Sequence, residues 1–572
     1  MGVFGSKTSQ SPAGPLARAR GGSRASTRTS RAERKVAREE ARAKRRQEAG
    51  ELKYLPGPRG WIGPGAGQMR VIDPALEYRG TSVQVCGLWP FALGSGTPMV
   101  GVPIGRNTET GATVCGDPIS WFMRAKLISN PSCFVLGKPG LGKSSLIRRI
   151  ALGLCAYGVN PLILGDLKGE HVDLVEALGG QVIKIGRGYG NLNILDPGSS
   201  RETVAKLAAA LDEAMEREHE LECATSRDEA ELEAVRARVR QLQKLHDGVL
   251  AEAHGRQLTM VSALITIARK TPPSVREDSI LDAAIRLLPK RIKNRAPLMS
   301  DLLDVIQEAP AEVRAVALDR GDDERYRDVT EELEATLISL VRGGRLGDVF
   351  GKPTTTPMLA DKPVVFDVSS IDDTDGDLQA AALLACWSTG FAAIENQHAL
   401  ADAGLAPRRH NFVVMDELWR ALRAGQGMVD RVDALSRLNR SVGVGVAMIS
   451  HTMSDLLALP REEDVQKARG LVERSGMLFL GGLPRAEMPK LREVVELSKV
   501  EEATLASWQD PPSWDHRTSQ EAEPPGRGRF LLKVGGRPGV PFRVELTPAE
   551  LAVNDTNKRW AAEAQPLEEG AA

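Results

Sequence analysis

The sequence contains few aromatic residues, which make up only 4% of its 572 residues. A chain of this length can form about two to four compact units. Their cores must therefore be built mainly from Ala, Leu, Val and Ile. A net charge is also absent, because 75 Lys and Arg balance 75 Asp and Glu. This average hides a strongly basic stretch up to about residue 46, so the remainder of the chain is acidic.

Cysteines are scarce, and their spacing forms no recognisable motif. The six cysteines include no C-x-x-C pair, and four of them lie inside apolar runs. This pattern favours reduced, buried thiols over the alternatives of disulfides or a metal site. The six are Cys86, Cys115, Cys133, Cys155, Cys223 and Cys386.

The sequence also lacks a long hydrophobic run. No stretch reaches the roughly 18 consecutive apolar residues that a membrane-spanning helix needs. The longest candidate, residues 83–104, is interrupted by prolines and glycines, and no apolar segment follows the basic N-terminus as in a signal peptide. We therefore expect a soluble, cytoplasmic protein that reaches a membrane only through partners.

Residues 1–55 are rich in Ser, Gly, Arg and Ala, and we expect them to form a disordered basic tail. Within this tail, residues 31–48 (RAERKVAREEARAKRRQE) could form a basic helix. Two interpretations remain open. The segment is either a solvated charged tail or an arm that binds DNA, anionic lipid or a partner protein.

Most of the remaining chain alternates between apolar strands and helices. Continuous apolar strands in this order predict an α/β fold with a mostly parallel sheet that is covered on both faces. A probable β-hairpin closes the pattern near the C-terminus. The strands are expected at 133–137, 161–167, 181–186, 363–369, 411–417, 443–450, 477–482, 529–534 and 541–546.

Between residues 201 and 350 the strand pattern stops, and helical periodicity with dense charge predicts an all-α insertion. Segments 202–222 and 228–255 predict a helical hairpin with a solvated face. Ahead of the first strand, short β-type runs such as TSVQVCGLW predict a small β-rich lead-in. The expected boundaries are 1–55 for the tail, 56–130 for the lead-in, 131–200 and 351–515 for the two parts of the α/β core, 201–350 for the insertion, and 516–572 for a C-terminal β-hairpin and tail.

A phosphate-binding loop lies between the first core strand and the helix after it. Its sequence, GKPGLGKS, matches G-x-x-x-x-G-K-[ST] in the required strand–loop–helix context. The glycines let backbone N–H groups close around phosphate oxygens, and the helix N-terminus adds a favourable dipole. Lys143 can reach the β- and γ-phosphates of ATP, and Ser144 can ligate Mg²⁺. The expected nucleotide-binding residues are Gly137, Lys138, Pro139, Gly140, Leu141, Gly142, Lys143, Ser144 and Ser145.

Two carboxylates at the end of a later strand can serve this loop. In NFVVMDELW, residues 411–419, a mostly apolar run leads into Asp416 and Glu417. We expect Asp416 to hold Mg²⁺, usually through water, and Glu417 to orient and polarise the attacking water. Alone, such a run could equally be a strand that ends at a solvated edge. The upstream loop favours the catalytic interpretation.

The strand at 443–450 is followed by His451, a candidate for contact with the γ-phosphate. The alternative is a histidine at the edge of the core. Arg437 and Arg440 lie just before this strand, about one helical turn apart and so on one face of the expected helix. Either could be an arginine finger supplied to a neighbouring subunit, with Arg440 favoured because it is closer to the strand. The alternative is a surface or salt-bridged arginine.

Two more polar clusters follow strands of the expected sheet: DLKGEH at 166–171 and NLNILDP at 191–197. Polar residues at the carboxyl ends of parallel strands line the ligand crevice in such folds. Both clusters could equally be ordinary turns between a strand and a helix.

Together these motifs resemble the large cytoplasmic ATPases of conjugative type IV secretion systems, the TraC/TrwK/CagE type within the HerA/FtsK-like superfamily of P-loop ATPases. The resemblance covers about residues 80 to 560. His451 stands where that family usually has Gln, and Ser441 where it often has Lys. The matching segments are GVPIGRNTETGATVCGD, FVLGKPGLGKSS, DLKGE, NLNILDP, FDVSSI, VVMDELW and RLNRSVGVGVAMISHTMSDL.

The resemblance implies a RecA-like P-loop NTPase core that binds ATP and Mg²⁺. It implies a homo-hexameric motor of a conjugative DNA-transfer system, peripheral at the inner face of the cell membrane. Membrane components of the secretion system would be its partners, and DNA could bind through the basic tail. Two alternatives remain: a DNA-pumping coupling protein or HerA/FtsK-like translocase, and a slow, nucleotide-dependent assembly scaffold. The resemblance assigns catalytic roles to Lys143, Glu417, His451 and either Arg440 or Arg437, and metal binding to Ser144 and Asp416.

Overall fold

The structure is a computed structural model, and the chain divides into two compact units, residues 1–91 and 92–572. In the first unit, residues 38–44 form an exposed helix inside the basic segment 31–48, where a helix was expected. The expected β-type run TSVQVCGLW lies outside the described residues. The residues that the structure describes are 36, 38–44, 97–224, 228–342, 344–423, 429–430, 432, 443–512, 514–515, 520–521 and 523–553.

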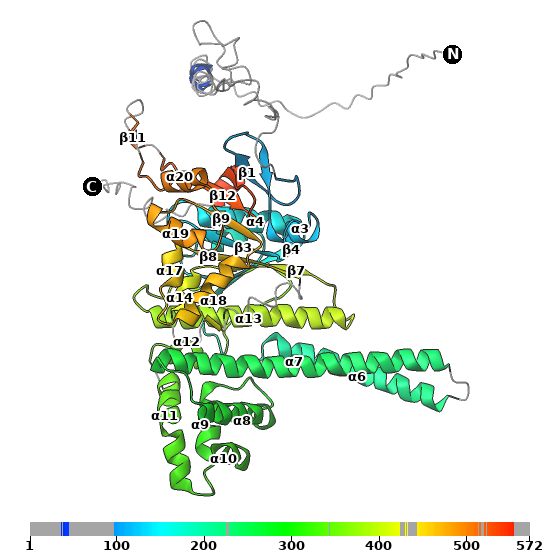
Figure 1. The fold of residues 1–572 in the computed structure, drawn as a ribbon. Coiled ribbons are helices and arrows are strands. Elements are labelled where there is room, and N and C mark those ends of the chain that lie inside the picture. The colour runs from blue at the N-terminus through cyan, green and yellow to red at the C-terminus, as the bar shows by residue number, and fades with distance from the viewer. Residues whose placement is uncertain are drawn as a thin grey trace, which may run out of the picture. The chain divides into compact units, whose positions relative to one another are not determined.

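The second unit is built on an 11-stranded sheet with the order β2-β1-β13-β12-β9-β3-β8-β7-β4-β6-β5 (Figure 1). From β9 to β5, every neighbouring pair is parallel. This confirms the expected mostly parallel sheet. The bounds of these strands are β9 Met477–Leu480, β3 Ser132–Leu136, β8 Val444–Ser450, β7 His410–Met415, β4 Val159–Asp166, β6 Val364–Asp367 and β5 Gln181–Lys184.

Four antiparallel strands extend the parallel sheet beyond β9. They are β12 (Arg529–Lys533), β13 (Val540–Val544), β1 (Pro103–Asn107) and β2 (Thr113–Cys115). The lead-in and the C-terminal hairpin, which the sequence places at opposite ends of the chain, therefore contribute strands to the same sheet as the core.

The two faces of the sheet are covered by different helices. In β3, Cys133 and Val135 belong to one apolar cluster, whereas Phe134 and Leu136 belong to the other. Because successive side chains of a strand point to opposite faces, both faces of β3 are buried, as its continuous apolar sequence predicts. Helices α3 (Pro118–Met123), α4 (Lys143–Ala156) and α5 (Val172–Ala177) contribute to the first cluster, and α13 (Gly376–Asp402) contributes to the second.

Helix α13 is the central helix of the second face. It is long and apolar enough to cross a membrane, but 78% of its most apolar window is buried inside the protein. Figure 1 shows it between the sheet and the helical insertion. Its apolar character is therefore explained by burial on two sides.

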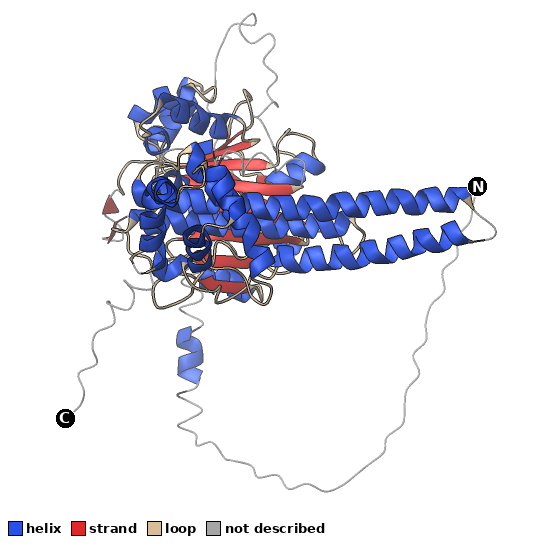
Figure 2. Ribbon diagram, turned by 90° about the horizontal axis from the view of Figure 1, so that it is seen from below, coloured by secondary structure: helices blue, strands red, loops and turns tan. Residues whose placement is uncertain are grey.

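The all-α insertion begins with a long hairpin of α6 (Ser199–Cys223) and α7 (Glu229–Arg269), which extends beyond the edge of the sheet (Figures 1 and 2). Helix α7 is longer than expected from the sequence, because its last turns enter the core of the insertion and bury Met260 to Ile267. The outer part of the hairpin is held instead by ion pairs, such as those of Arg236 with Glu218 and Glu222. The helices that follow are α8 Val275–Arg291, α9 Met299–Glu308, α10 Ala311–Ala317, α11 Asp323–Val341 and α12 Gly347–Phe350.

Shorter elements complete the unit. Most of the helix expected at 432–441 lies outside the described residues. The remaining described elements are α14 Leu418–Leu422, α17 Met453–Leu457, α18 Glu462–Glu473, the 3₁₀ helix Arg485–Glu487, α19 Met488–Arg492, α20 Lys499–Ser507, β10 Trp514–Asp515, β11 Gln520–Glu521 and α21 Pro548–Val553.

The described cysteines are free thiols, as expected. Cys115, Cys133 and Cys386 are buried, and Cys155 is half-buried. Cys223 differs from the expected buried state, because it is exposed at the end of α6.

Helix α13 packs closely against the sheet at Gly390. A Cβ atom on Gly390 would lie 2.4 Å from Cδ2 of Leu164, a fully buried side chain in β4. We predict that Gly390→Ala lowers the melting temperature, because overpacking costs about 1–3 kcal/mol and exceeds the helix-propensity gain of up to about 1 kcal/mol.

Gly248→Ala in α7 is the matched control, since a Cβ there would meet no atom within 4 Å. It should raise the melting temperature slightly. If both variants are stabilised equally in thermal unfolding, the close packing of α13 on β4 is wrong.

Candidate nucleotide-binding and catalytic site

The candidate site lies where four neighbouring parallel strands end: β3, β8, β7 and β4. The phosphate-binding loop follows β3, and His451 follows β8. Asp416 and Glu417 follow β7, and Lys168 lies just beyond β4. Because parallel strands present their carboxyl ends at one edge of a sheet, segments far apart in the sequence meet there.

The loop has the conformation that its glycines allow. Gly140 and Gly142 have φ angles of 78° and 94°, a region that L side chains rarely adopt. A Cβ on Gly140 would meet no atom within 4 Å, so this side of the loop is open. A Cβ on Gly137 would instead lie 3.3 Å from Cα of Gly481, so this glycine permits close approach of the chain after β9.

Backbone hydrogen bonds hold the start of the loop against its neighbours. Gly137 N donates to His451 O at 3.0 Å, and Lys138 N donates to Gly482 O at 3.1 Å. The loop is therefore fixed on both sides, by the ends of β8 and β9.

The C-terminal part of the chain also supports the loop. Gly528 N donates to Leu141 O at 2.9 Å, and Lys138 Nζ donates to Gln509 Oε1 at 2.9 Å. The Lys138 side chain thus contacts the C-terminal part of the chain. No local pattern predicts the contact of Gly528 with the loop, because Gly528 reaches it through the pairing of β12 with β9.

Lys143 lies inside the loop and is only 8% exposed. Its Nζ donates to Gly137 O at 2.7 Å and to Lys138 O at 3.2 Å, and lies 3.1 Å from Nδ1 of His451. Burial lowers the pKa of Lys143 to about 8, although nearby carboxylates act to raise it. A bound phosphate would supply the negative charge that this buried ammonium lacks.

His451 connects the loop to the carboxylate of Glu417. Its Nδ1 faces the Lys143 ammonium, and its Nε2 lies 3.2 Å from Oε1 of Glu417. An ammonium can only donate, so Nδ1 acts as the acceptor and Nε2–H donates to the carboxylate. This geometry fits the neutral Nε2–H tautomer.

Glu417 is held by three groups, and its side chain is 3% exposed. Trp419 Nε1 donates to Oε2 at 2.6 Å, while His451 Nε2 and Lys168 Nζ lie 3.2 and 3.3 Å from Oε1. Burial acts to raise the pKa of Glu417, but the hydrogen bond from His451 and the charge of Lys168 lower it to about 2. Its φ of 48° is rare for a residue other than glycine, and such strain clusters at functional sites.

Asp416 fits the metal-binding role expected from the sequence. Burial and the charge of Glu417 raise the pKa of Asp416 to about 7 and outweigh the opposing charge of Lys168, so a bound cation would stabilise the ionised carboxylate. Ser144, in the first turn of α4, offers a hydroxyl oxygen. Oxygen donors of this kind suit Mg²⁺, which keeps several water ligands and needs few groups from the protein.

The structure brings together most of the expected catalytic residues: Lys143, His451 and Glu417. Arg437 and Arg440 lie outside the described residues. Lys168 and Trp419 were not expected to take part. The available signal was their place in DLKGEH and NFVVMDELW, each directly after a parallel strand.

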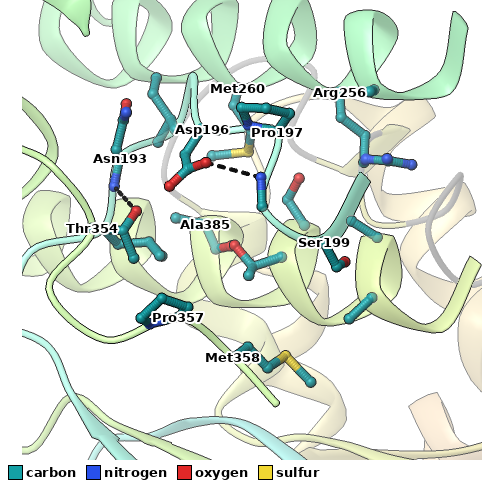
Figure 3. A pocket seen from close by; sticks show the side chains of 18 of the residues that line it. Asn193, Asp196, Pro197, Ser199, Arg256, Met260, Thr354, Pro357, Met358 and Ala385 are labelled. Carbon is teal, nitrogen blue, oxygen red and sulfur yellow. Dashed lines mark hydrogen bonds between the residues drawn. The ribbon is translucent and has the colours of Figure 1, made fainter. Parts of the chain in front are cut away.

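The second polar cluster, NLNILDP, takes part in a different site. It lines a cavity of about 280 Å³ between the α6–α7 hairpin and α13 (Figure 3). Asn193 N donates to Thr354 Oγ1 at 3.2 Å, and Asn193 Nδ2 donates to Pro297 O at 2.9 Å. This segment therefore joins the insertion to the core, in agreement with its interpretation as a structural turn.

No protein-family model and no curated protein matches the sequence. Among solved structures, VirB4 of Thermoanaerobacter pseudethanolicus aligns with a TM-score of 0.55 over 80% of this chain and 100% of that chain, at 17% sequence identity. The chain shares the fold of VirB4. This likeness agrees with the mostly parallel α/β fold expected from the sequence.

The plasmid coupling protein TrwB, in complex with ADP and Mg²⁺, aligns at 13% identity over 73% of this chain and 86% of that chain. Its TM-score of 0.40 is too low to carry an argument.

The buried position of Lys143 predicts that its ammonium dominates phosphate binding. Lys143→Ala should weaken the binding of a fluorescent ATP analogue with Mg²⁺ by about 10- to 100-fold, the value of one charge-assisted hydrogen bond of about 1.5–3 kcal/mol. Lys206→Ala, on the solvated side of α6 and paired only with Glu202 among the described residues, is the control and should bind normally. Equal affinity of the two variants would exclude Lys143 from the nucleotide site.

Proposed function

We propose that this protein is a Mg²⁺-dependent ATPase that drives a conjugative type IV secretion system, in assembly or in substrate transfer. The observation that carries the proposal is the linked row Lys143–His451–Glu417–Lys168 beside the open phosphate-binding loop. A purely structural sheet edge would not need a buried lysine inside the loop and a strained, buried glutamate beside it.

In this proposal the loop residues 137–145 bind the phosphates of ATP. Lys143 neutralises charge on the β- and γ-phosphates, and Ser144 and Asp416 hold Mg²⁺. The metal, when bound, neutralises the negative charge that develops during phosphoryl transfer. The backbone N–H groups at the start of α4 add fixed donors that need no rearrangement.

Glu417 is proposed to orient and polarise the attacking water. Its low pKa keeps it ionised at neutral pH, as an acceptor for a water proton must be. His451 is proposed as the sensor, because its ring contacts both the loop lysine and Glu417. A change at the phosphate can thus reach the carboxylate through one imidazole.

We further propose a homo-hexamer in the cytoplasm, peripheral at the inner face of the membrane and bound to membrane components of the secretion system. Arg440 or Arg437 would then reach the site of a neighbouring subunit as an arginine finger. DNA could bind the basic tail that includes the exposed helix 38–44. The likeness in fold to VirB4, a P-loop ATPase, supports this context.

The first test is Glu417→Gln. The amide keeps the shape of the side chain but is a poor base, so ATP binding should persist while kcat falls by about 10²- to 10⁴-fold. Steady-state hydrolysis and binding of a fluorescent ATP analogue measure the two effects separately. Unchanged turnover would remove Glu417 from catalysis.

The same hydrolysis assay, with and without single-stranded or duplex DNA, separates the alternative functions. Strong stimulation by DNA would favour a DNA-pumping translocase. Very slow turnover that DNA does not change would favour an assembly scaffold.

The arginine finger predicts complementation between subunits. Replacing the finger with Ala should leave ATP binding nearly intact and reduce turnover by about 10³-fold or more. Mixing that variant with Lys143→Ala should restore some activity, because some interfaces then combine an intact loop with an intact finger. If neither Arg440→Ala nor Arg437→Ala is complemented in mixed assemblies that still form, the finger lies elsewhere.

A further inference from the structure

We propose that Lys168 is a positioning residue for Glu417. Its ammonium fixes one carboxylate oxygen, so that the carboxylate is already oriented before nucleotide binds. The inference rests on the proposed ATPase function and assigns a role to the DLKGEH segment. The contact that carries it is Lys168 Nζ to Glu417 Oε1, at 3.3 Å.

The turn that presents Lys168 is rigidly built. Asp166, the last residue of β4, is 1% exposed, and its carboxylate accepts three backbone hydrogen bonds. The donors are the N–H groups of Lys168, Glu170 and His171, at 3.2, 3.1 and 2.6 Å. A side chain that satisfies three donors within four residues fixes the path of the backbone, so the Lys168 Cα has little freedom.

Gly169 completes this turn. Its φ of 68° lies in the region that favours glycine. A Cβ there would make only an ordinary contact, 3.5 Å from Ser369 Oγ, so it is the backbone angle that favours glycine. The sequence Asp-x-Lys-Gly therefore has a physical reason at each of its defined positions: a carboxylate to close the turn, a cation to present, and a glycine to allow the turn.

Glu417 needs such support because its backbone is strained and its carboxylate is buried. Trp419 donates to Oε2. Its ring also contacts Arg420 and Arg423, whose guanidinium carbons lie 5.1 and 4.7 Å from the ring centre. Without Lys168, Oε1 would keep one neutral donor, His451 Nε2–H. A lone neutral donor balances a buried carboxylate less well than an ammonium does.

The geometry favours a role through Glu417 over direct phosphate binding. Lys143 already occupies the loop, bonded to Gly137 and Lys138 carbonyls. Lys168 instead directs its ammonium to the carboxylate of Glu417, just after β7. Its effect should therefore appear in turnover and not in nucleotide affinity.

The test compares Lys168→Met, which keeps the side-chain length without the charge, with Lys168→Arg, which keeps the charge. Lys206→Met on the surface of α6 is the control and should behave as wild type.

For each variant we would measure the Kd of a fluorescent ATP analogue with Mg²⁺, the KM and kcat of hydrolysis, and the melting temperature. Lys168→Met should lower kcat by about 10- to 100-fold, the scale expected for a misplaced catalytic group, with Kd and KM within about threefold of wild type. Lys168→Arg should recover most of the loss.

A double-mutant cycle with Glu417→Gln gives the decisive result. If Lys168 acts only through the Glu417 carboxylate, adding Lys168→Met to Glu417→Gln should cause no further loss of the residual turnover. An equal further loss, a Kd weakened tenfold or more, or an unchanged kcat in the single variant would each overturn the proposal. Absence of hydrolysis by the wild type would instead overturn the proposed function itself. If Lys168→Met melts well below wild type, its loss of turnover can come from unfolding. Lys168→Arg then replaces it in the cycle with Glu417→Gln, to decide whether Lys168 acts through Glu417 or only stabilises the fold.

Discussion

The register of the parallel strands is the constraint on which the site depends. In the β3–β8 pair, Leu136 lies opposite Ser450, so the first residues beyond the strands, Gly137 and His451, are level with each other. The hydrogen bond from Gly137 N to His451 O follows from this register. A slip of one residue would turn every side chain to the other face and separate the loop from the imidazole.

The same register sets an alternating order of charge across the edge of the sheet. Lys143 and Lys168 are cationic, and Glu417 lies between them with His451 as a neutral link. Burying a charge is tolerable only when a partner of opposite charge or a hydrogen bond compensates it. Asp416 is the exception, since its pKa is raised, and this is where a divalent cation would complete the balance.

The core strands and the loop could be predicted from the sequence because their signals are local. Runs such as CFVLG and NFVVM bury both faces, and the loop glycines follow directly. The C-terminal hairpin of β12 and β13 was also predicted. Its place in the core sheet could not be, because there β12 pairs with β9 and β13 pairs with β1, with Gly105 opposite Val544. The Lys168–Glu417 contact was missed for a related reason. It depends on β4 lying beside β7, and strand order is a property of the whole topology that no local pattern carries. Helix α7 was predicted too short because the charged helical pattern stops near residue 255. The apolar residues that follow continue the same helix into the core of the insertion.

The position of α13 gives the insertion a physical connection to the catalytic carboxylate. Lys270, at the end of α7, forms an ion pair with Asp377 in the first turn of α13, and Gln379 in the next turn accepts a hydrogen bond from Arg420. Arg420 stacks on Trp419, which in turn holds Glu417, whereas the loop is bonded to the ends of β8 and β9 and to the C-terminal segment. A displacement of the insertion would therefore disturb the orientation of Glu417 through direct contacts while leaving the supports of the phosphate-binding loop in place. Under the proposed ATPase function, force on the helical hairpin is therefore expected to change the rate of hydrolysis more than the affinity for nucleotide.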